Sequence, residues 1–345
     1  MHDSSTETAT VDLAASIKGI LNTIERDRER EIISRRFGLF DRKETLEQVG
    51  ELLGITRERV RQLEKAIMIR LKMAAESNLP QIPELEKQFI RHLHDLGRVA
   101  KVNDLSALVT KNDTELDRAH VAFIAALSPR LTLVEENDRY HQGVGLSEFH
   151  DSDKIKKNVD EIIKTIKESG SPVTVDSLHE KLSHDHPSHV KALASLSKQL
   201  ANLKGKWGLT QWPSVNPKNI RDKIFVILQE NDKPMHFNEI AKAIKGSDFR
   251  RKDVTTQAIH NELIKDSRFV LIGRGIYALK DWGYSKGTVA DIIVDVLKKE
   301  GNPLHRDEIV KRVLKHRQVK ETTILLNLQG KKQFKRTAKA TYGLA

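Results

Sequence analysis

Residues 45–65 read TLEQVGELLGITRERVRQLEK, and this stretch decides how the N-terminal part of the chain folds. Thr45 and Gln48 have the spacing of a capping box, which begins a helix. Gly54 suits the left-handed residue that ends this helix, and Thr56 suits the cap of a second helix. The pattern predicts a helix, a short glycine turn and a helix, as in a helix-turn-helix. An ordinary helical hairpin with a charged surface is the alternative.

Two stripes run along the second of these helices. Apolar residues recur at steps of three and four and predict a buried face: Val60, Leu63, Ile67 and Leu71. Another face holds basic residues at steps of four, with Glu58 and Gln62 beside them: Arg57, Arg61 and Lys65. Because side chains three or four residues apart share one face of a helix, we expect the charged face to point away from the core.

Two segments resemble region 4 of the sigma-70 family, the bacterial RNA polymerase subunits that recognise promoters. They are DREREIISRRFGL (residues 27–39) and ETLEQVGELLGITRERVRQLEKAIMIRLK (residues 44–72), within a similarity that covers residues 11–76. The resemblance implies that the second helix enters the major groove of a promoter −35 element. It implies base-reading roles for Arg57, Glu58, Arg61 and Gln62. It also implies phosphate contacts from Arg36, Arg42 and Thr45, and Lys65 of the basic stripe is a further candidate phosphate contact.

The residue types on this helix suit base recognition. Arginine grips the O6 and N7 atoms of guanine, glutamine pairs with adenine, and glutamate accepts from the N4 group of cytosine. Phosphate contacts position a protein on DNA without reading its sequence.

Composition bounds the class of protein. The 345 residues hold 59 Lys and Arg against 48 Asp and Glu, a formal charge of +11, which favours a polyanionic partner. There is no cysteine, so no disulfide or thiolate metal site is expected. The N-terminus is polar and no apolar run has the length of a membrane span. We expect a cytoplasmic, nucleoid-associated protein that binds double-stranded DNA, with no membrane partner, cofactor or small-molecule substrate.

A repeat of about 60 residues follows the first module. Three segments align: ESGSPVTVDSLHEKL (168–182), ENDKPMHFNEIAKAI (230–244) and KEGNPLHRDEIVKRV (299–313). Each follows an amphipathic helix and precedes an aromatic-rich strand, and a weaker copy covers residues 89–143. This order is typical of winged helices. We predict a mainly α fold with a tail (1–10), a helix-turn-helix module (11–77) and four winged-helix units (84–146, 154–213, 217–284 and 286–345).

The third copy, residues 217–284, also resembles the HARE-type winged helix, a family that includes the N-terminal domain of the RNA polymerase delta subunit. KPMHFNEIAKAI and DSRFVLIGRGIYALKDW carry this resemblance, and residues 273–275 read as the wing turn. The candidate recognition helix covers residues 254–266. Basic residues near this helix and in the wing are candidate phosphate contacts: Arg250, Arg251, Lys252 and Arg274.

Charge is unevenly spread along the sequence. Residues 1–80 hold 14 Lys and Arg and 14 Asp and Glu, whereas residues 286–345 hold 14 and 6. A neutral reading module gains little from phosphate attraction, so we expect a second element to hold it on DNA. The C-terminal tract offers further candidate phosphate contacts: Lys331, Lys332, Lys335 and Arg336.

Other chemistry has weaker support in the sequence. The histidines of HEKLSHDHPSH (residues 179–189) could bind zinc, but a polar loop between helices fits them better, and we expect no metal site. No phosphate-binding loop or nucleophile motif is present, so we expect no enzyme activity.

Three functions remain open. The favoured one is a sigma-like, sequence-specific transcription regulator that lacks the promoter-melting region and contacts RNA polymerase through Leu13, Ile17, Leu21, Ile32 and Ile33. The alternatives are a protein-interaction scaffold associated with RNA polymerase, and a non-catalytic DNA-binding component of a restriction or modification system.

Overall fold

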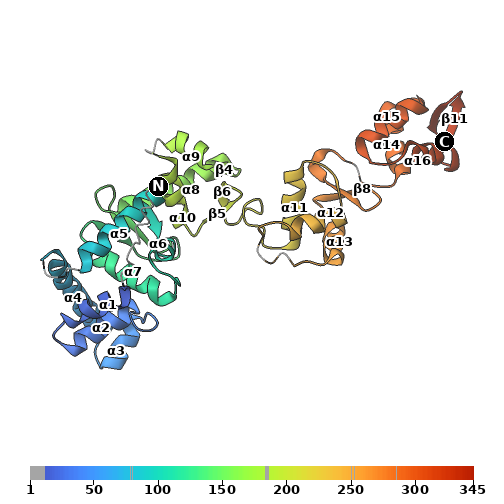
Figure 1. Ribbon diagram of the computed structural model, residues 1–345. Helices are drawn as coiled ribbons and strands as arrows, with labels where there is room; N and C mark the ends of the chain where they lie inside the picture. Colours follow the sequence, from blue (N-terminus) through green and yellow to red (C-terminus); the bar gives the residue numbers. More distant parts are fainter. Residues whose placement is uncertain are drawn as a thin grey trace, which may run out of the picture. The chain divides into compact units, whose positions relative to one another are not determined.

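The computed structural model describes residues 12–77, 79, 81–182, 186–249, 251, 253–284 and 286–345 (Figure 1). The tail predicted over residues 1–10 lies outside this range. The chain divides into two compact parts, residues 1–210 and residues 211–345. None of the described helices combines the length and the apolar character that crossing a bilayer requires.

Residues 12–77 form the helix-turn-helix module. Its four helices are α1 (Leu13–Asn22), α2 (Asp27–Phe37), α3 (Leu46–Leu53) and α4 (Arg57–Ser77). The turn after α2 requires glycine, since Gly38 has φ +67° and a Cβ there would lie 2.8 Å from the Lys43 nitrogen. A small core of Ile32, Val49 and Val60 joins α2, α3 and α4.

The same arrangement then occurs four times in the described residues: helix, short strand, two helices and a β-hairpin. In each copy the last strand lies between the other two, in the orders β1-β3-β2, β4-β6-β5, β7-β9-β8 and β10-β12-β11. All these pairings are antiparallel. The structure confirms the predicted fold class, mainly helical with small β-hairpins, and we name the copies the first to fourth winged units.

The bounds of their elements are as follows. The first winged unit contains α5 (Gln81–Leu96), β1 (Val99–Lys101), α6 (Val102–Val109), α7 (Glu115–Leu127), β2 (Leu131–Val134) and β3 (Gly143–Leu146). The second contains α8 (Ser152–Ser169), β4 (Val173–Thr174), α9 (Val175–Leu182), α10 (Pro187–Leu196), β5 (Leu200–Leu203) and β6 (Lys206–Leu209). The third contains α11 (Ile220–Asn231), β7 (Met235–His236), α12 (Phe237–Lys245), α13 (Thr256–Lys265), β8 (Phe269–Gly273), β9 (Ile276–Leu279) and the short helix η1 (Lys280–Trp282). The fourth contains α14 (Val289–Glu300), β10 (Leu304–His305), α15 (Arg306–His316), α16 (Glu321–Gly330), β11 (Phe334–Ala338) and β12 (Thr341–Leu344).

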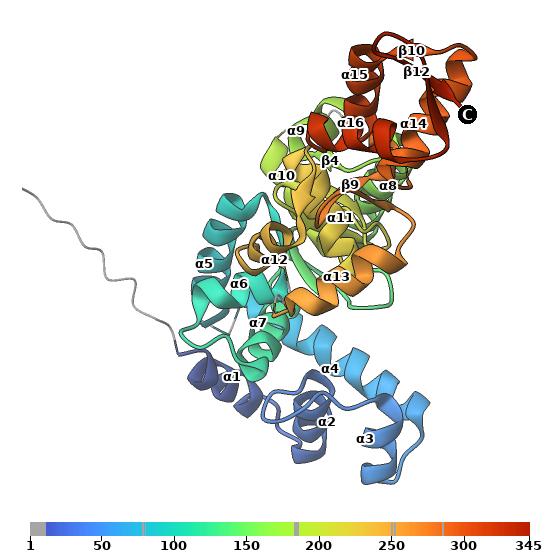
Figure 2. The same cartoon turned by 90° about the vertical axis from the view of Figure 1, so that its right-hand side faces the viewer.

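One apolar core runs from the helix-turn-helix module into the first winged unit. It includes Ile17 of α1, Ile67 of α4, Phe89 of α5 and Phe123 of α7. Figures 1 and 2 show α1 beside α7 in both views. The module and the first winged unit are therefore packed as one body.

In the C-terminal part, the fourth winged unit contacts the wing of the third. The Gln318 nitrogen donates to the Ile272 carbonyl at 3.0 Å, and Arg317 Nη1 donates to the Leu271 carbonyl at 3.5 Å. Burial lowers the pKa of Arg317 from its ordinary value. A Cβ at Gly273 would lie 2.9 Å from the Gln318 carbonyl oxygen, so this contact depends on glycine.

Candidate nucleic-acid interface

The turn between α3 and α4 has the geometry that the sequence predicts. The Gln48 nitrogen donates to Thr45 Oγ1 at 3.2 Å, and the Thr45 nitrogen donates to Gln48 Oε1 at 2.8 Å, which completes the capping box. Gly54 is left-handed with φ +64°, and Thr56 Oγ1 accepts from the Arg59 nitrogen at 3.2 Å. Thr45 thus fixes where α3 begins, and Thr56 fixes where α4 begins.

The same turn fixes the spacing between the two helices. A Cβ at Gly50 would lie 2.7 Å from the Ile55 carbonyl oxygen. The backbone before α4 therefore approaches α3 so closely that only glycine fits at position 50. Val60 of α4 is fully buried against Val49 of α3. The opposite face of α4 is therefore held outward at a defined angle.

That outward face carries the predicted base-reading residues. All four are exposed side by side in the first two turns of α4: Arg57, Glu58, Arg61 and Gln62. Lys65 is exposed one turn further along and forms no ion pair with a described carboxylate. The arrangement of the five side chains on one face is confirmed, whereas their contacts with DNA stay a prediction.

The arginines of this face are paired with carboxylates. Arg61 Nε and Nη2 donate to the two oxygens of Glu58 at 2.8 and 2.7 Å, and Arg57 Nη1 lies 2.8 Å from Glu47 Oε1. The hydrogen bonds from Arg61 lower the pKa of Glu58 to about 2, so this carboxylate stays ionised at neutral pH. The face is held in a fixed, nearly neutral arrangement of donors and acceptors.

Two of the predicted phosphate contacts have structural partners within the module. Arg36 has a side chain that is 17% exposed, and its Nε donates to Glu64 Oε2 at 2.7 Å. Arg36 also donates to the Glu44 carbonyl, so it ties α2 to α4 and to the segment before α3. Thr45 is exposed but its hydroxyl is used as the cap of α3.

Arg42 lies in a different setting. It is exposed and lines a cavity of about 500 Å³ between the turn after α2 and the first winged unit. Lys43, Lys101 and Arg118 line the same cavity, together with Asp41, Glu115 and Glu136. Of the three predicted cationic phosphate contacts in the module, Arg42 and Lys65 have no ion pair with a described carboxylate, whereas Arg36 is paired with Glu64.

The candidates in the third winged unit lie around α13 and the wing. Arg250 and Lys252 lie outside the described residues. Arg251 is exposed just before α13, and its carbonyl accepts from Lys223 Nζ at 2.7 Å. Arg274 is exposed in the turn between β8 and β9, which is the predicted wing turn.

The candidates in the fourth winged unit lie on its hairpin. Lys335 and Arg336 are exposed on the edge strand β11, and Lys331 and Lys332 are exposed in the turn before it. None of the four forms an ion pair with a described carboxylate. Arg57 and Arg61 of α4 differ from these four cations, because each of the two arginines is paired with a carboxylate.

The net charge also differs between the two parts of the chain. Residues 211–345 hold 27 Lys and Arg against 15 Asp and Glu, a net charge of +12. Since the whole chain carries +11, residues 1–210 carry −1. The long-range attraction for a polyanion therefore comes from the C-terminal part.

The structure contradicts the predicted polymerase-docking surface. Four of its residues are 2% exposed or less, and Leu13 is 7% exposed: Ile17, Leu21, Ile32 and Ile33. These side chains fill the cores of the module itself and of its contact with the first winged unit. A partner cannot reach them in this structure. The sequence signal for this burial was α7, whose residues 120–127 (HVAFIAAL) are apolar on more than one face.

The histidine-rich segment, predicted as a polar loop between helices, runs from the end of α9 into α10, so part of it is helical. His189 is buried in α10, its Nδ1 lies 2.7 Å from the Gly97 carbonyl oxygen, and its Nε2 lies 3.1 Å from Nε2 of His150. His186 caps α10, and His184 lies outside the described residues. The described residues contain no group of three or more possible metal ligands.

Comparisons with known proteins find relatives of the helix-turn-helix module. Residues 26–73 match the family model of Sigma-70, region 4, and so include α2, α3 and most of α4. The chain is 36% identical over 80 residues to RNA polymerase sigma factor SigA1 of Synechococcus elongatus, which is 23% of this chain and 18% of that protein. It is 37% identical over 82 residues to RNA polymerase sigma factor RpoD of Helicobacter pylori, which is 23% of this chain and 11% of that protein.

These similarities are partial on both sides. The chain spans less than a fifth of the length of the curated relatives that it matches, and the matched domain is a small part of the chain. The winged units are left unassigned by these comparisons, so the HARE-type likeness of the third unit stays a prediction. Residues 26–73 are a sigma-70 region 4 domain, a helix-turn-helix related to the promoter-binding domain of sigma factors.

Proposed function

We propose that this protein is a sequence-specific DNA-binding transcription regulator of the sigma-like kind. The observation that carries the proposal is the outer face of α4 in a sigma-70 region 4 domain. Arg57, Glu58, Arg61 and Gln62 stand exposed on one face, with donors and acceptors that match base edges in a major groove. Their target is a duplex element of the promoter −35 type.

The C-terminal part serves as the anchor in this proposal. A module with a charge near zero gains little affinity from phosphates, whereas residues 211–345 carry +12. Phosphate contacts come from Arg42 and Lys65 of the module, from Arg250, Arg251, Lys252 and Arg274 of the third winged unit, and from Lys331, Lys332, Lys335 and Arg336 of the fourth. Arg36 and Thr45 act indirectly, because their side chains hold the module together.

The family similarity covers residues 26–73, the domain that holds the predicted reading helix. We therefore propose a nucleoid-associated regulator that binds promoters, rather than a factor that opens them. Contact with RNA polymerase remains part of the proposal. It requires a surface other than Leu13, Ile17, Leu21, Ile32 and Ile33, since these side chains are buried.

The proposal is tested by mapping where the protein crosslinks along its own genome. We compare wild type with Arg57→Ala/Arg61→Ala and with the control Lys87→Ala/Arg91→Ala. The control removes two exposed cations at the same i, i+4 spacing, on α5. Promoter peaks that disappear in the first variant and persist in the control support the proposal. Peaks that persist in both variants would overturn base reading by α4.

A further inference from the structure

The third helix of each winged unit occupies the same place, between the second helix and the hairpin, but its burial differs between units. Helices α10, α13 and α16 each have ten residues, all described. Six residues of α10 are buried. Two residues are buried in α13, Ile259 and Leu263, and two in α16, Ile324 and Leu328. Helix α7 has seven buried residues among its thirteen, all of which are described. The four copies of one fold therefore fall into two pairs.

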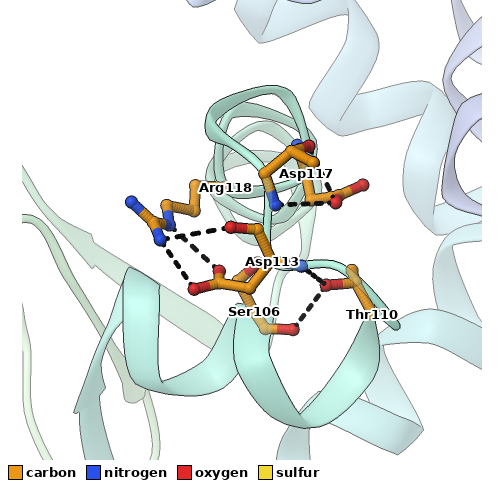
Figure 3. A network of polar contacts seen from close by, with 6 residues as sticks. Ser106, Thr110, Asp113, Asp117 and Arg118 are labelled. Carbon is orange, nitrogen blue, oxygen red and sulfur yellow. Dashed lines mark hydrogen bonds and ion pairs between the residues drawn. The ribbon is translucent and has the colours of Figure 1, made fainter.

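Helix α7 is covered by the helix-turn-helix module. The ring of Phe123 packs edge-on against Phe37 of α2, with 4.9 Å between centroids, and His120 Nε2 lies 2.8 Å from the Leu39 carbonyl oxygen. Figure 3 shows how α7 is fixed at its start, where Arg118 folds back and donates to the Asp113 carboxylate. The buried residues of α7 belong to the core that the module shares with the first winged unit.

Helix α10 is covered by the first winged unit. Its Leu196 carbonyl accepts from the His141 nitrogen at 2.8 Å, and its His189 contacts the Gly97 carbonyl. A Cβ at Gly143 of β3 would lie 2.5 Å from Leu196 Cδ2, so the two surfaces meet without space between them. A duplex cannot reach α7 or α10 without separating these packed surfaces.

Helices α13 and α16 keep an open outer face. The two buried residues of α13 align with those of α16, Ile259 with Ile324 and Leu263 with Leu328. With the helices aligned in this way, three positions on the outer face of α13 correspond to three on the outer face of α16. These are exposed in both helices: Gln257, Asn261 and Ile264 in α13, and Thr322, Leu326 and Gln329 in α16. Ile264 is 64% exposed and Leu326 is 67% exposed. At these three positions α13 has two carboxamides and α16 has one carboxamide and a threonine; each face also has one large exposed aliphatic side chain and no acid.

This combination suits A·T base pairs in a major groove. Carboxamides pair with N6 and N7 of adenine, and apolar side chains contact the thymine methyl group. Gln257 Nε2 donates to Asn261 Oδ1 at 3.1 Å, which leaves the Gln257 oxygen and the Asn261 nitrogen as one acceptor and one donor, side by side. The wing that follows α16 carries exposed cations that form no ion pair with a described carboxylate, and these favour DNA over a protein as the occupant: Lys331, Lys332, Lys335 and Arg336.

We propose that α13 and α16 read A·T base pairs of duplex DNA, while α7 and α10 serve to build the N-terminal part. The inference takes its ligand class, duplex DNA, from the proposed function, and it adds a second reading surface that is independent of α4. The predicted binding site therefore has A·T positions in addition to the positions read by α4.

The experiment is selection of binding sites from random duplexes with the full chain. Four variants are compared with wild type: Gln257→Ala/Asn261→Ala, Leu326→Ala/Gln329→Ala, Arg57→Ala/Arg61→Ala and the control Asn238→Ala, an exposed carboxamide on α12. We expect the first two variants to lose A·T positions that the α4 variant and the control retain. Circular dichroism and thermal melting establish that each variant is folded.

A chemical probe follows on the selected wild-type site. Replacing adenine by 7-deazaadenine at each A·T position removes the N7 acceptor and should weaken wild type by roughly fivefold or more at one position. The same replacement should have no effect on folded Gln257→Ala/Asn261→Ala. If that variant and the α16 variant select the wild-type site with unchanged affinity, this inference is overturned while reading by α4 stands. If the α4 variant is the one variant of the three that still selects the wild-type site with unchanged affinity, the proposed function fails and the inference stands.

Discussion

Arg61 and Glu58 hold each other on the outer face of α4 through two hydrogen bonds of 2.8 and 2.7 Å. The pair presents a donor and an acceptor in fixed positions, and it neutralises the charge of the predicted reading face. Gln62 Nε2 also donates to Glu58 Oε1 at 3.3 Å, so three of the four predicted base-reading residues form one network. Any contact with a base must replace or extend this network.

Replacing Glu58 by Gln should therefore separate affinity from specificity. The change removes one negative charge and releases Arg61, so binding to unrelated duplexes should strengthen while discrimination at one base pair should fall by roughly tenfold or more. Affinities for a selected site and for its single-base variants measure both effects. Glu84→Gln on α5 is the control, since it removes an exposed carboxylate of the same charge from a helix outside the reading face. Equal effects of the two substitutions would contradict the assignment of Glu58.

The titration of Glu58 gives a prediction that does not depend on DNA. Hydrogen bonds from Arg61 lower its pKa to about 2 from an ordinary 4.5. Because the folded-state pKa is the lower one, the stabilisation by this pair is complete above the unfolded value and is lost as the pH falls from about 4.5 through about 2. Carboxyl carbon NMR of wild type and Arg61→Ala measures this, and the pKa should return toward 4.5 in the variant. An unchanged midpoint would show that the pair does not form in solution.

The local structure of the reading element could be predicted from the sequence because its causes are local. Capping by Thr45, the left-handed turn at Gly54 and the burial of Val60 each depend on residues within one or two helical turns. A helix is also predicted within residues 254–266 of the third winged unit, and α13 covers Thr256–Lys265; its role in recognition stays a prediction.

The errors concern surfaces that distant residues cover. Ile17 and Ile33 have the pattern of an apolar docking face, but Phe123, about a hundred residues away in the sequence, belongs to the core that buries them. The pairing of Arg36 with Glu64 was likewise not visible in the sequence, and the predicted phosphate contact of Arg36 stays a prediction. Periodicity shows that a face is apolar or charged, and it does not show which part of the chain occupies that face.

The hairpin of the fourth winged unit should set how binding depends on salt. Lys335→Ala/Arg336→Ala removes two exposed cations that have no described carboxylate partner, so binding should weaken for all duplex sequences alike. The slope of log affinity against log salt should become shallower by about 1 for each phosphate that the protein no longer neutralises. Lys298→Ala/Lys299→Ala, at the exposed end of α14, removes the same charge from the same unit. If both variants change the slope equally, net charge explains the anchor and the hairpin has no particular role.

The packing of α7 against the helix-turn-helix module should contribute much of the stability of the N-terminal part. Phe123 is fully buried against Phe37, so Phe123→Ala should destabilise the folded state by about 3–5 kcal/mol, because apolar burial is removed and a cavity is left behind. Leu108→Ala is the control in the same unit, because Leu108 is half exposed and its truncation should cost about 0.5 kcal/mol or less. Chemical denaturation of both variants measures the difference. A loss of stability for Phe123→Ala as small as that of the control would mean that the module and the first winged unit are not packed together in solution, and the buried role assigned to α7 would then be wrong.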